Sequence, residues 1–438
     1  MIDSGNDYSW KGSDTLGWNP SCPKVKIKSE KKEAVTGGTL WTFSNGMRVV
    51  YKEVPGNRIF HYALQLNGGL AQIDGLQEGE GGYMGELLSL CDVGGLPAAH
   101  FRDVLQANGI RMDTQVDLNS LSIEGSAPST QFVLLLKLLL ELANNRVFNP
   151  AEYESYRQCE LLRTPDRETL LKAQLAPGYT YTTSKNPQAL SADSWKKAEK
   201  YYADRFSRMN DGVLILSGDL GTEVVKKMLC RYLGGFRVLK GTVPRKAVEF
   251  SPRSGTVSLT AEGPDKGIHI LMDAPYALTA DHFYTAQVGV EALRRILTQH
   301  LAAYGFSCDV RLGQMAHPQE RFQLYIDCRP LPLAGVPADV TEISAERALT
   351  AVRAAIQEAA AQPVEAKDLA LWKSKLSGEV KGVMASPLGF VSTLLVRYAI
   401  NKDLTSRYAE SIAAITAQQL QEFFAVMAQG GRVECIVL

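Results

Sequence analysis

Residues 79–91 read GEGGYMGELLSLC and follow a predicted β-strand, residues 61–67, and a glycine-rich connection. The run indicates a helix whose polar side is placed for chemistry. It holds no histidine, however, and its only carboxylates are Glu80 and Glu86. The glycines inside the run cost helix stability and allow another backbone to pack closely. We therefore expect the polar face of this helix to be filled by backbone contact rather than by ligands.

The segments around this helix predict an α+β fold. Residues 40–54, LWTFSNGMRVVYKEV, indicate two strands joined by a turn at Asn45-Gly46, a strong signal for a β-hairpin. Strands and helices then alternate along the chain in two successive blocks, about 39–240 and 250–438, with the same order of elements. This order predicts an internal duplication of an α+β domain.

The predicted organisation has three parts. Residues 1–38 are polar and rich in lysine, which is typical of a linker or tether. We expect a first domain at 39–242 and a second at 250–438, joined by the linker 243–254, VPRKAVEFSPRS. A chain of 438 residues is long enough for two domains, each with a core of ordinary size.

Composition restricts the partners and the compartment. Lys+Arg and Asp+Glu both number 47, and this balance disfavours nucleic acid and anionic membranes as main partners. The most apolar run, residues 132–143, is too short to span a bilayer, so we expect no membrane insertion. Residues 1–14 do not have the pattern of a signal peptide. We expect a cytoplasmic protein if the chain is complete, and a periplasmic or exported one if it is a fragment of a longer precursor.

The patterns of several hydrolases and metal sites are absent from the sequence. The seven cysteines include no CxxC pair, so we expect free thiols. Ser217 lacks the glycine that a nucleophile elbow places two residues earlier, and no glycine-rich run precedes Lys-Ser/Thr. No two histidines stand three or four residues apart, which excludes HExxH and HxxEH motifs. The six histidines are His61, His100, His269, His282, His300 and His317.

Five segments of the first block resemble the N-terminal domain of the pitrilysin/insulinase family of zinc peptidases. This family includes mitochondrial processing peptidase and the core subunits of the respiratory bc1 complex. The resemblance implies a mitochondrial-processing-peptidase-like fold: two similar domains, each a mostly antiparallel sheet covered by helices on one face. The segments are FSNGMRVVYKEVPG (43–56), LQLNGGLAQID (64–74), GEGGYMGELL (79–88), the run from LQANG to NPAEYE (105–154) and GVLILSGDLGTEVVKKMLCRYLGGF (212–236).

Where the family carries its zinc motif, this sequence departs from the pattern. The family has His-x-x-Glu-His on this helix, with a distal glutamate as third protein ligand and an open fourth position for water. The resemblance aligns the two histidines with Gly82 and Glu86 and the catalytic glutamate with Gly85. Glu160 lies near the distal position, and we interpret it as a solvated helix residue. The resemblance thus implies no catalytic or metal residue and no cofactor in this chain, with zinc expected in a partner half.

The resemblance also implies substrate-binding residues in the second domain. In several family members the zinc-free half supplies an arginine and a tyrosine to the substrate carbonyl and the transition state. In residues 294–313, RRILTQHLAAYGFSCDVRLG, Tyr304 matches the tyrosine. Arg295 and Arg294 are the nearest candidates for the arginine. The simpler interpretation makes Tyr304 a packing residue at a helix end and the arginines exposed charges.

Three functions remain open at this point. The first is the non-catalytic half of a zinc-dependent endopeptidase. It would line and close a chamber for unfolded peptides, paired with a zinc-bearing half in tandem or as a heterodimer. The second is a purely structural scaffold subunit, similar to the bc1 core proteins. The third is a hydrolase with unrelated chemistry in the same cavity, which stoichiometric zinc in the purified protein would favour.

Overall fold

The chain forms two compact units, each discontinuous in sequence. The computed structural model describes residues 18, 20–56, 58–263, 265–332 and 344–438. The first unit comprises the described parts of Met1–Thr164, Thr180–Ala247 and Val383–Asn401. The second comprises those of Pro165–Tyr179, Val248–Gly382 and Lys402–Leu438. Each block of the sequence therefore contributes one short segment to the unit that is built mainly from the other block.

The first unit is built on a seven-stranded sheet in the order β1-β2-β3-β9-β4-β7-β6. β3 and β9 run parallel, and the other neighbours are antiparallel. β5 and β8 pair in a separate small sheet. The elements are β1 (Ile27–Lys32), β2 (Thr39–Phe43), β3 (Arg48–Glu53), β4 (Ile59–Asn67), η2 (Leu70–Gln72), η3 (Gly81–Tyr83), α1 (Met84–Leu88), β5 (Cys91–Val93), α2 (Ala98–Ala107), β6 (Arg111–Val116), β7 (Ser120–Pro128), η4 (Ser129–Gln131), α3 (Phe132–Asn144), β8 (Arg146–Phe148), α4 (Pro150–Leu161), η5 (Pro187–Ala189), α6 (Ser194–Phe206), β9 (Gly212–Gly218), α7 (Thr222–Tyr232), η6 (Leu233–Gly235) and α11 (Pro387–Ile400).

The second unit repeats the topology of the first. Its five-stranded sheet has the order β10-β14-β11-β13-β12, with β10 and β14 parallel and the rest antiparallel. β3-β9-β4-β7-β6 has the same connectivity and the same parallel pair, so the predicted duplication of an α+β domain is confirmed as a fold. The elements are α5 (Arg167–Leu175), β10 (Gly255–Ala261), β11 (Gly267–Pro275), α8 (Ala280–Ala302), β12 (Phe306–Met315), β13 (Arg321–Pro330), α9 (Ala345–Ala361), most of α10 (Ala366–Ala385), α12 (Tyr408–Ala414), α13 (Ala417–Gln429) and β14 (Gly431–Val437).

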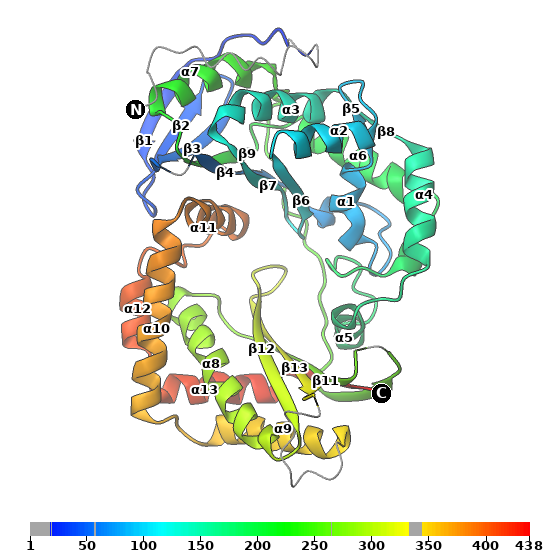
Figure 1. Cartoon of the computed structure of the whole chain (residues 1–438), viewed down its shortest axis with the longest axis vertical. Helices are drawn as coiled ribbons and strands as arrows, with labels where there is room; N and C mark the ends of the chain where they lie inside the picture. The colour runs from blue at the N-terminus through cyan, green and yellow to red at the C-terminus, as the bar shows by residue number, and fades with distance from the viewer. Residues whose placement is uncertain (1–17, 19, 57, 264, 333–343) are drawn as a thin grey trace. The chain divides into compact units, whose positions relative to one another are not determined.

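Both faces of the first sheet are covered, because α11 packs on the face that the other helices leave open (Figure 1). Successive strand residues point to opposite faces. Val49 and Leu64 belong to the large core that α3, α6 and α7 cover, whereas Val50 and Ala63 contact α11. Phe390 of α11 is 1% exposed. A helix from the second sequence block thus completes the first unit.

The second sheet is likewise covered by a helix, α5, that comes from the first sequence block. Leu171 and Leu175 of α5 are buried against Leu271 of β11 and Val433 of β14. The side chain of Asp166 accepts a hydrogen bond from the Thr169 amide at 2.7 Å, which caps the first turn of α5. The resemblance implied helices on one face of each sheet only. In the described residues, each sheet also has a helix on its other face: α11 in the first unit and α5 in the second.

Residues 1–38 differ in part from the expected tether. Residues 1–17 and 19 lie outside the described residues. Farther on, β1 (Ile27–Lys32) pairs antiparallel with β2 at the edge of the sheet. Its lysines are typical of edge strands, since exposed charges disfavour pairing with further chains. The sequence suggested a solvated face because a half-exposed edge strand carries little apolar pattern.

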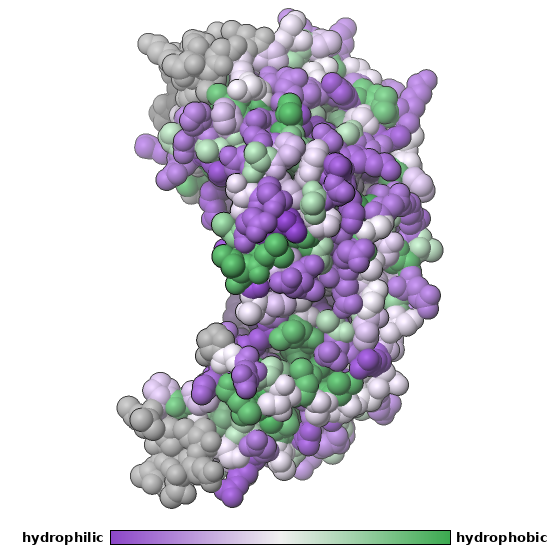
Figure 2. Space-filling model, turned by 90° about the vertical axis from the view of Figure 1, so that its right-hand side faces the viewer, coloured by the Kyte–Doolittle hydropathy of each residue, from purple (hydrophilic) through white to green (hydrophobic). Residues whose placement is uncertain are grey.

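The surface of the described residues is mixed in character. On the face drawn in Figure 2, hydrophilic residues predominate, and apolar residues gather in small separate patches. Among the described residues, no single helix has the length and apolar composition needed to cross a membrane. α10 and α11 meet that test only as a pair, with a bend of 97° between them.

An ion-pair cluster that includes α5 gives the second unit an expected dependence on pH. The Asp327 carboxylate contacts Nδ1 of the buried His269 at 2.7 Å, and Arg167 of α5 contacts Nε2 at 2.7 Å. The hydrogen bond with His269 lowers the pKa of Asp327 below its ordinary value of 3.8. A lowered folded-state pKa contributes stability above the ordinary pKa, and this contribution is lost as the pH falls through the folded-state value.

We therefore predict that Asp327→Asn lowers the free energy of unfolding at pH 7 by about 1.5 kcal/mol, the scale of a hydrogen bond to a charged group. The gap between wild type and variant should close as the pH falls below the ordinary carboxyl range. Urea unfolding at pH 7 and at several acidic values measures both effects. A gap that stays constant down to the most acidic point would contradict the linkage.

A candidate site degenerate at its metal positions

The predicted helix at residues 79–91 is shorter than expected. It consists of the 3-10 turn η3 and the five-residue helix α1, and Cys91 already begins β5. The name degenerate site is used below for the three motif positions Gly82, Gly85 and Glu86. It also includes Glu160 and the side chains that contact the two glutamates. All of these residues lie in the first unit.

Backbone of other segments covers the two glycines. A Cβ atom on Gly82 would lie 2.5 Å from the carbonyl oxygens of both Thr183 and Ser184. A Cβ atom on Gly85 would lie 2.3 Å from the carbonyl oxygen of Thr114 on β6. Such distances are far inside van der Waals contact, so no side chain fits at either position without backbone movement. The glycines therefore permit the close backbone approach that the sequence indicated.

The third position retains a side chain, and polar partners engage it. The Glu86 carboxylate receives hydrogen bonds from the Tyr156 hydroxyl of α4 and from the Lys185 ammonium group. Lys185 also lies 5.7 Å from the centre of the Tyr83 ring, where a cation is attracted to the ring face. Lys185 thus balances the charge of Glu86 and Tyr156 donates to it, with no imidazole among these partners.

Glu160 is buried, and its interpretation as a solvated helix residue was wrong. Only 6% of it is exposed. It forms an ion pair with Arg163 at 3.2 Å and a side-chain hydrogen bond with Tyr83. The helix pattern of α4 did not reveal this burial because the covering side chain, Tyr83, lies 77 residues earlier in the chain. The covering contact also satisfies the carboxylate, as burial of a charge requires.

The two tyrosines of the site donate hydrogen bonds to the two glutamates. Burial raises the pKa of Tyr83, and the neighbouring Glu160 raises it further. Burial and the hydrogen bond to Glu86 raise the pKa of Tyr156. Both phenols are therefore protonated across the physiological range, and neither is poised as a base or nucleophile.

The residues present do not fit a zinc centre. Catalytic zinc needs three protein ligands, usually histidines and a carboxylate, with room for a water molecule. Two of the motif positions are glycines under backbone oxygens, and Glu86 and Glu160 are each held by their own donors. Within the described ranges, no group of three or more His, Cys, Asp or Glu side chains could hold a metal ion. We derive no catalytic step from this site.

A buried carboxylate anchors the start of the degenerate helix. Glu80 is fully buried, and it accepts hydrogen bonds from the Gln77 amide at 2.8 Å, the Ser194 hydroxyl at 2.5 Å and the Lys197 ammonium at 2.7 Å. Lys197 also donates to the Gly75 carbonyl oxygen at 2.6 Å. Sequence reasoning noted Glu80 only as one of two carboxylates. Its two side-chain donors, Ser194 and Lys197, come from α6, more than a hundred residues away, so no local pattern could reveal them.

Arg295 and Tyr304, the two expected substrate-binding residues, do not contact each other in the described part of the chain. Arg295 forms an ion pair with Asp368. Tyr304 lies just beyond the end of α8, where its amide donates to the Leu301 carbonyl oxygen at 3.0 Å.

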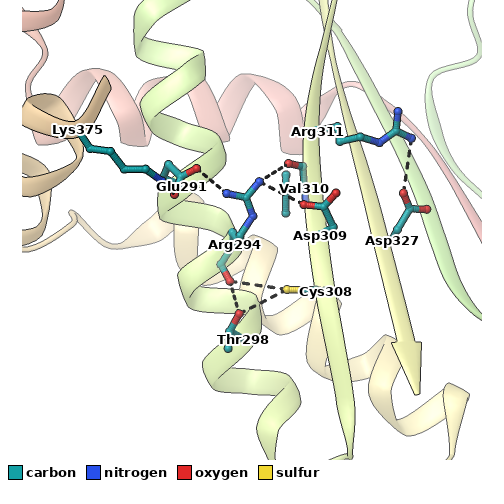
Figure 3. A network of polar contacts seen from close by, with 9 residues as sticks. All are labelled: Glu291, Arg294, Thr298, Cys308, Asp309, Val310, Arg311, Asp327 and Lys375. Atoms are coloured by element: carbon teal, nitrogen blue, oxygen red, sulfur yellow. Dashed lines mark hydrogen bonds and ion pairs between the residues drawn. The ribbon is translucent and has the colours of Figure 1, made fainter. Parts of the chain in front are cut away.

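The alternative arginine, Arg294, belongs to a polar network in the second unit (Figure 3). It extends from α8 toward β12, where it donates to the Val310 carbonyl oxygen at 2.8 Å and contacts Asp309 at 3.2 Å. It also pairs with Glu291 of its own helix. Arg294 therefore ties α8 to the outer strand of the sheet, which differs from an exposed helix charge.

Sequence reasoning missed Tyr83, Tyr156 and Lys185 as members of the degenerate site. Tyr156 and Lys185 are 70 and 99 residues from Glu86 in sequence. The glycine-rich run at residues 79–85 was the available signal, since it marks a place where another segment approaches closely. Nothing in the run identifies residues 182–186 as that segment.

The fold matches solved structures of M16 peptidases. The periplasmic protease PqqL from Escherichia coli aligns with a TM-score of 0.72 and 13% identity, over 96% of this chain and 47% of that one. A protease from Helicobacter pylori aligns at 0.71 and 13%, over 92% of this chain and all of that one. The peptidase M16 inactive domain from Pseudomonas fluorescens aligns at 0.68 and 16%, over 91% and 98%.

These matches define the class of fold. The chain has the two-domain fold of an M16, or pitrilysin-type, peptidase half, as the resemblance implied, and one matching structure is described as an inactive domain. The chain spans about half the length of PqqL. No protein-family model and no curated protein matches the sequence. At these identities the likeness establishes the fold, and the activity must be argued from the residues.

Proposed function

We propose that this chain is the non-catalytic half of a pitrilysin-type zinc endopeptidase. In this proposal it lines and closes a chamber for unfolded peptides and pairs with a zinc-bearing half or subunit. The single observation that carries the proposal is the covering of Gly82 and Gly85 by backbone oxygens within a fold of the M16 type. A site in that state cannot hold the metal, so cleavage requires a second half.

The length of the matching proteins supports the pairing. Nearly the whole chain aligns with less than half of PqqL, whereas it spans almost all of the inactive domain from Pseudomonas fluorescens. A partner half of similar size would account for this difference. We propose a tandem or heterodimeric arrangement in which the partner supplies the zinc, its three ligands and the general base.

Tyr304 is the proposed contact to the substrate. It is partly exposed beyond the end of α8, and a phenol can donate a hydrogen bond to a carbonyl oxygen that gains charge in the transition state. Arg295 is the proposed second donor, but it must first leave its ion pair with Asp368. The arginine is 45% exposed but Asp368 only 14%, so breaking the pair leaves a largely buried carboxylate and opposes this role for Arg295.

The test is reconstitution with a chain from the same source that carries His-x-x-Glu-His. We expect no cleavage of a fluorogenic unfolded peptide by this chain alone, and cleavage by a stable complex of the two. Size-exclusion chromatography measures the complex and peptide fluorescence measures the rate. The proposal fails if the two chains neither associate nor cleave faster together than the zinc-bearing chain does alone.

A scaffold function is the second candidate, and the Arg295–Asp368 ion pair favours it because it occupies the proposed donor. Tyr304→Phe in the reconstituted complex separates the two functions. If Tyr304 donates to the transition state, kcat should fall about 100-fold while KM changes little. His300→Gln, four residues earlier on α8, serves as a control that should leave kcat unchanged. An unaltered kcat in Tyr304→Phe would support the scaffold function.

A further inference from the structure

A polar cavity of about 390 Å³ lies in the first unit, apart from the degenerate site. Arg48 and Gln65 of the sheet, Tyr398 and Asn401 at the end of α11, and residues 242–245 are among the residues that line it. Its volume falls within the range of small-molecule sites. The described residues that line it include two arginines, Arg48 and Arg245, and no carboxylate.

The sheet register explains why polar side chains gather here. Val50 of β3 and Ala63 of β4 face α11. Arg48 and Gln65 lie two residues from them and therefore share the same face, past the end of the helix. Gln65 pairs with Val213 of β9, which separates the two strands. Two strand spacings of about 4.8 Å put the backbones of Arg48 and Gln65 about 10 Å apart, a gap that one small ligand can bridge.

Gln65 is a buried polar side chain that lacks a partner. It is 2% exposed and lines the cavity, and its Nε2 atom has no hydrogen-bond partner among the described residues. Leaving such a group unsatisfied costs about 1–3 kcal/mol. A ligand that presents a hydrogen-bond acceptor to Gln65 would remove this cost.

The guanidinium group of Arg48 is held in place through its Nε atom, which leaves its two terminal nitrogens able to bind a ligand. Its Nε atom donates to the Gly212 carbonyl oxygen at 3.0 Å, and the guanidinium lies 5.9 Å from the centre of the Tyr398 ring. These two contacts fix the plane of the group. Within the described ranges, the structure gives the two terminal nitrogens no hydrogen-bond partner. A guanidinium oriented in this way matches the two oxygens of a carboxylate.

Asp211, an acidic group next to the cavity wall, is already satisfied. Asp211 is 4% exposed, and its carboxylate accepts from the Asn67 side chain at 2.8 Å and the Val243 amide at 2.7 Å. The second of these contacts also holds the 242–245 segment in place. Asp211 therefore supports the cavity wall and is not available to a cationic ligand.

The end of α11 restricts the ligand further. Tyr398 and Asn401 line the cavity at the C-terminal end of that helix. This end carries partial negative charge and free carbonyl oxygens, which disfavour a dianion such as phosphate and favour an N–H donor. The wall thus offers cationic and amide donors on the sheet side and acceptors on the helix side.

We propose that this cavity binds a small molecule in which a carboxylate stands close to an N–H group, of the size of an amino acid or a dipeptide. The carboxylate contacts Arg48 and Gln65, and the N–H group faces the end of α11. The site lies wholly in the first unit and needs no zinc-bearing partner. Its test is therefore separate from that of the proposed function.

Calorimetric titration of the purified chain tests the site with three probes: alanyl-alanine, its C-terminal amide, and inorganic phosphate. We expect saturable binding of alanyl-alanine and affinity for the amide lower by about ten-fold or more, because a charge-assisted hydrogen bond is lost. Phosphate should bind more weakly than alanyl-alanine. Equal binding of the dipeptide and its amide, or tighter binding of phosphate, overturns the proposal.

Two variants locate the binding. Arg48→Leu and Gln65→Leu should each weaken alanyl-alanine by about ten-fold. Gln65→Leu should fold as stably as wild type, since it removes an unsatisfied buried amide. The control Arg111→Leu removes a charge that is 78% exposed on β6, at the edge of the same sheet, and should leave binding unchanged. Wild-type affinity in a folded Gln65→Leu variant, or no binding to the wild-type chain at millimolar dipeptide, rejects the site.

Discussion

Restoring the zinc motif by Gly82→His, Gly85→Glu and Glu86→His is expected to destabilise the first unit rather than create a metal centre. Even the smallest change, Gly85→Ala, places a Cβ atom 2.3 Å from the Thr114 carbonyl oxygen. Overpacking of this kind costs about 1–3 kcal/mol, and the contact is with backbone, which cannot turn aside. The gain in helix propensity from Gly to Ala, about 1 kcal/mol, is smaller.

Because the contact is with backbone, we take the upper end of that range, about 3 kcal/mol, and expect Gly85→Ala to lower the free energy of unfolding by about 2 kcal/mol net, and Gly82→Ala to do the same. The full motif should lose about 4 kcal/mol or more, a large part of the stability of an ordinary domain. Chemical denaturation followed by circular dichroism measures the loss. Zinc added to the restored motif should not recover stability.

Gly378→Ala is the matched control for these substitutions. Gly378 lies in the interior of α10, and a Cβ atom there would meet nothing within 4 Å. The same change should thus stabilise the protein by about 0.5–1 kcal/mol through helix propensity alone. Stabilisation by Gly85→Ala to the same extent would show that the backbone contact over α1 does not exist.

Removing the cation beside Glu80 is expected to have the second large effect. Lys197→Met leaves a fully buried carboxylate with only the Ser194 hydroxyl and the Gln77 amide as donors. Breaking a buried pair by removing one partner costs about 3–5 kcal/mol, because the remaining charge stays uncompensated. We expect a loss near 3 kcal/mol, since Lys197 is 24% exposed and water can reach the gap.

The control lies next to it on α6. Lys196 pairs with Asp193 at the surface, with side chains 59% and 68% exposed, so Lys196→Met should change stability by less than about 1 kcal/mol. The double variant Glu80→Gln/Lys197→Met should recover part of the loss, since no buried charge then remains. Urea unfolding of the wild type, Glu80→Gln, Lys197→Met and the double variant measures the coupling. Equal effects of Lys196→Met and Lys197→Met would contradict the anchoring role of Glu80.

The sequence revealed the fold where local patterns decide it. The hairpin at Asn45-Gly46 forms as expected from β2 and β3, because the turn residues and the strands favour the same structure. The duplication was visible as a repeated order of elements, and the equivalent strand orders of the two sheets confirm it. Both signals need only information from neighbouring residues.

The exchange of helices between the units could not be predicted in this way. An apolar stripe on α11 shows that the helix packs on something, but it does not identify a sheet more than 160 residues away. α5 was missed altogether, although Asp166 is a good N-cap, because RETLLKAQL is short and only weakly amphipathic. The contacts of Glu86 and Glu160 depend on the same long-range packing.

The zinc content of the purified chain tests the central claim most directly. The chain should be equilibrated with an equimolar zinc salt, desalted and analysed by mass spectrometry of the metal. With Gly82 and Gly85 under backbone oxygens and Glu86 bound by Lys185 and Tyr156, we predict far less than one zinc per chain. One zinc per chain, retained through desalting, would contradict the account of a half that depends on its partner for the metal.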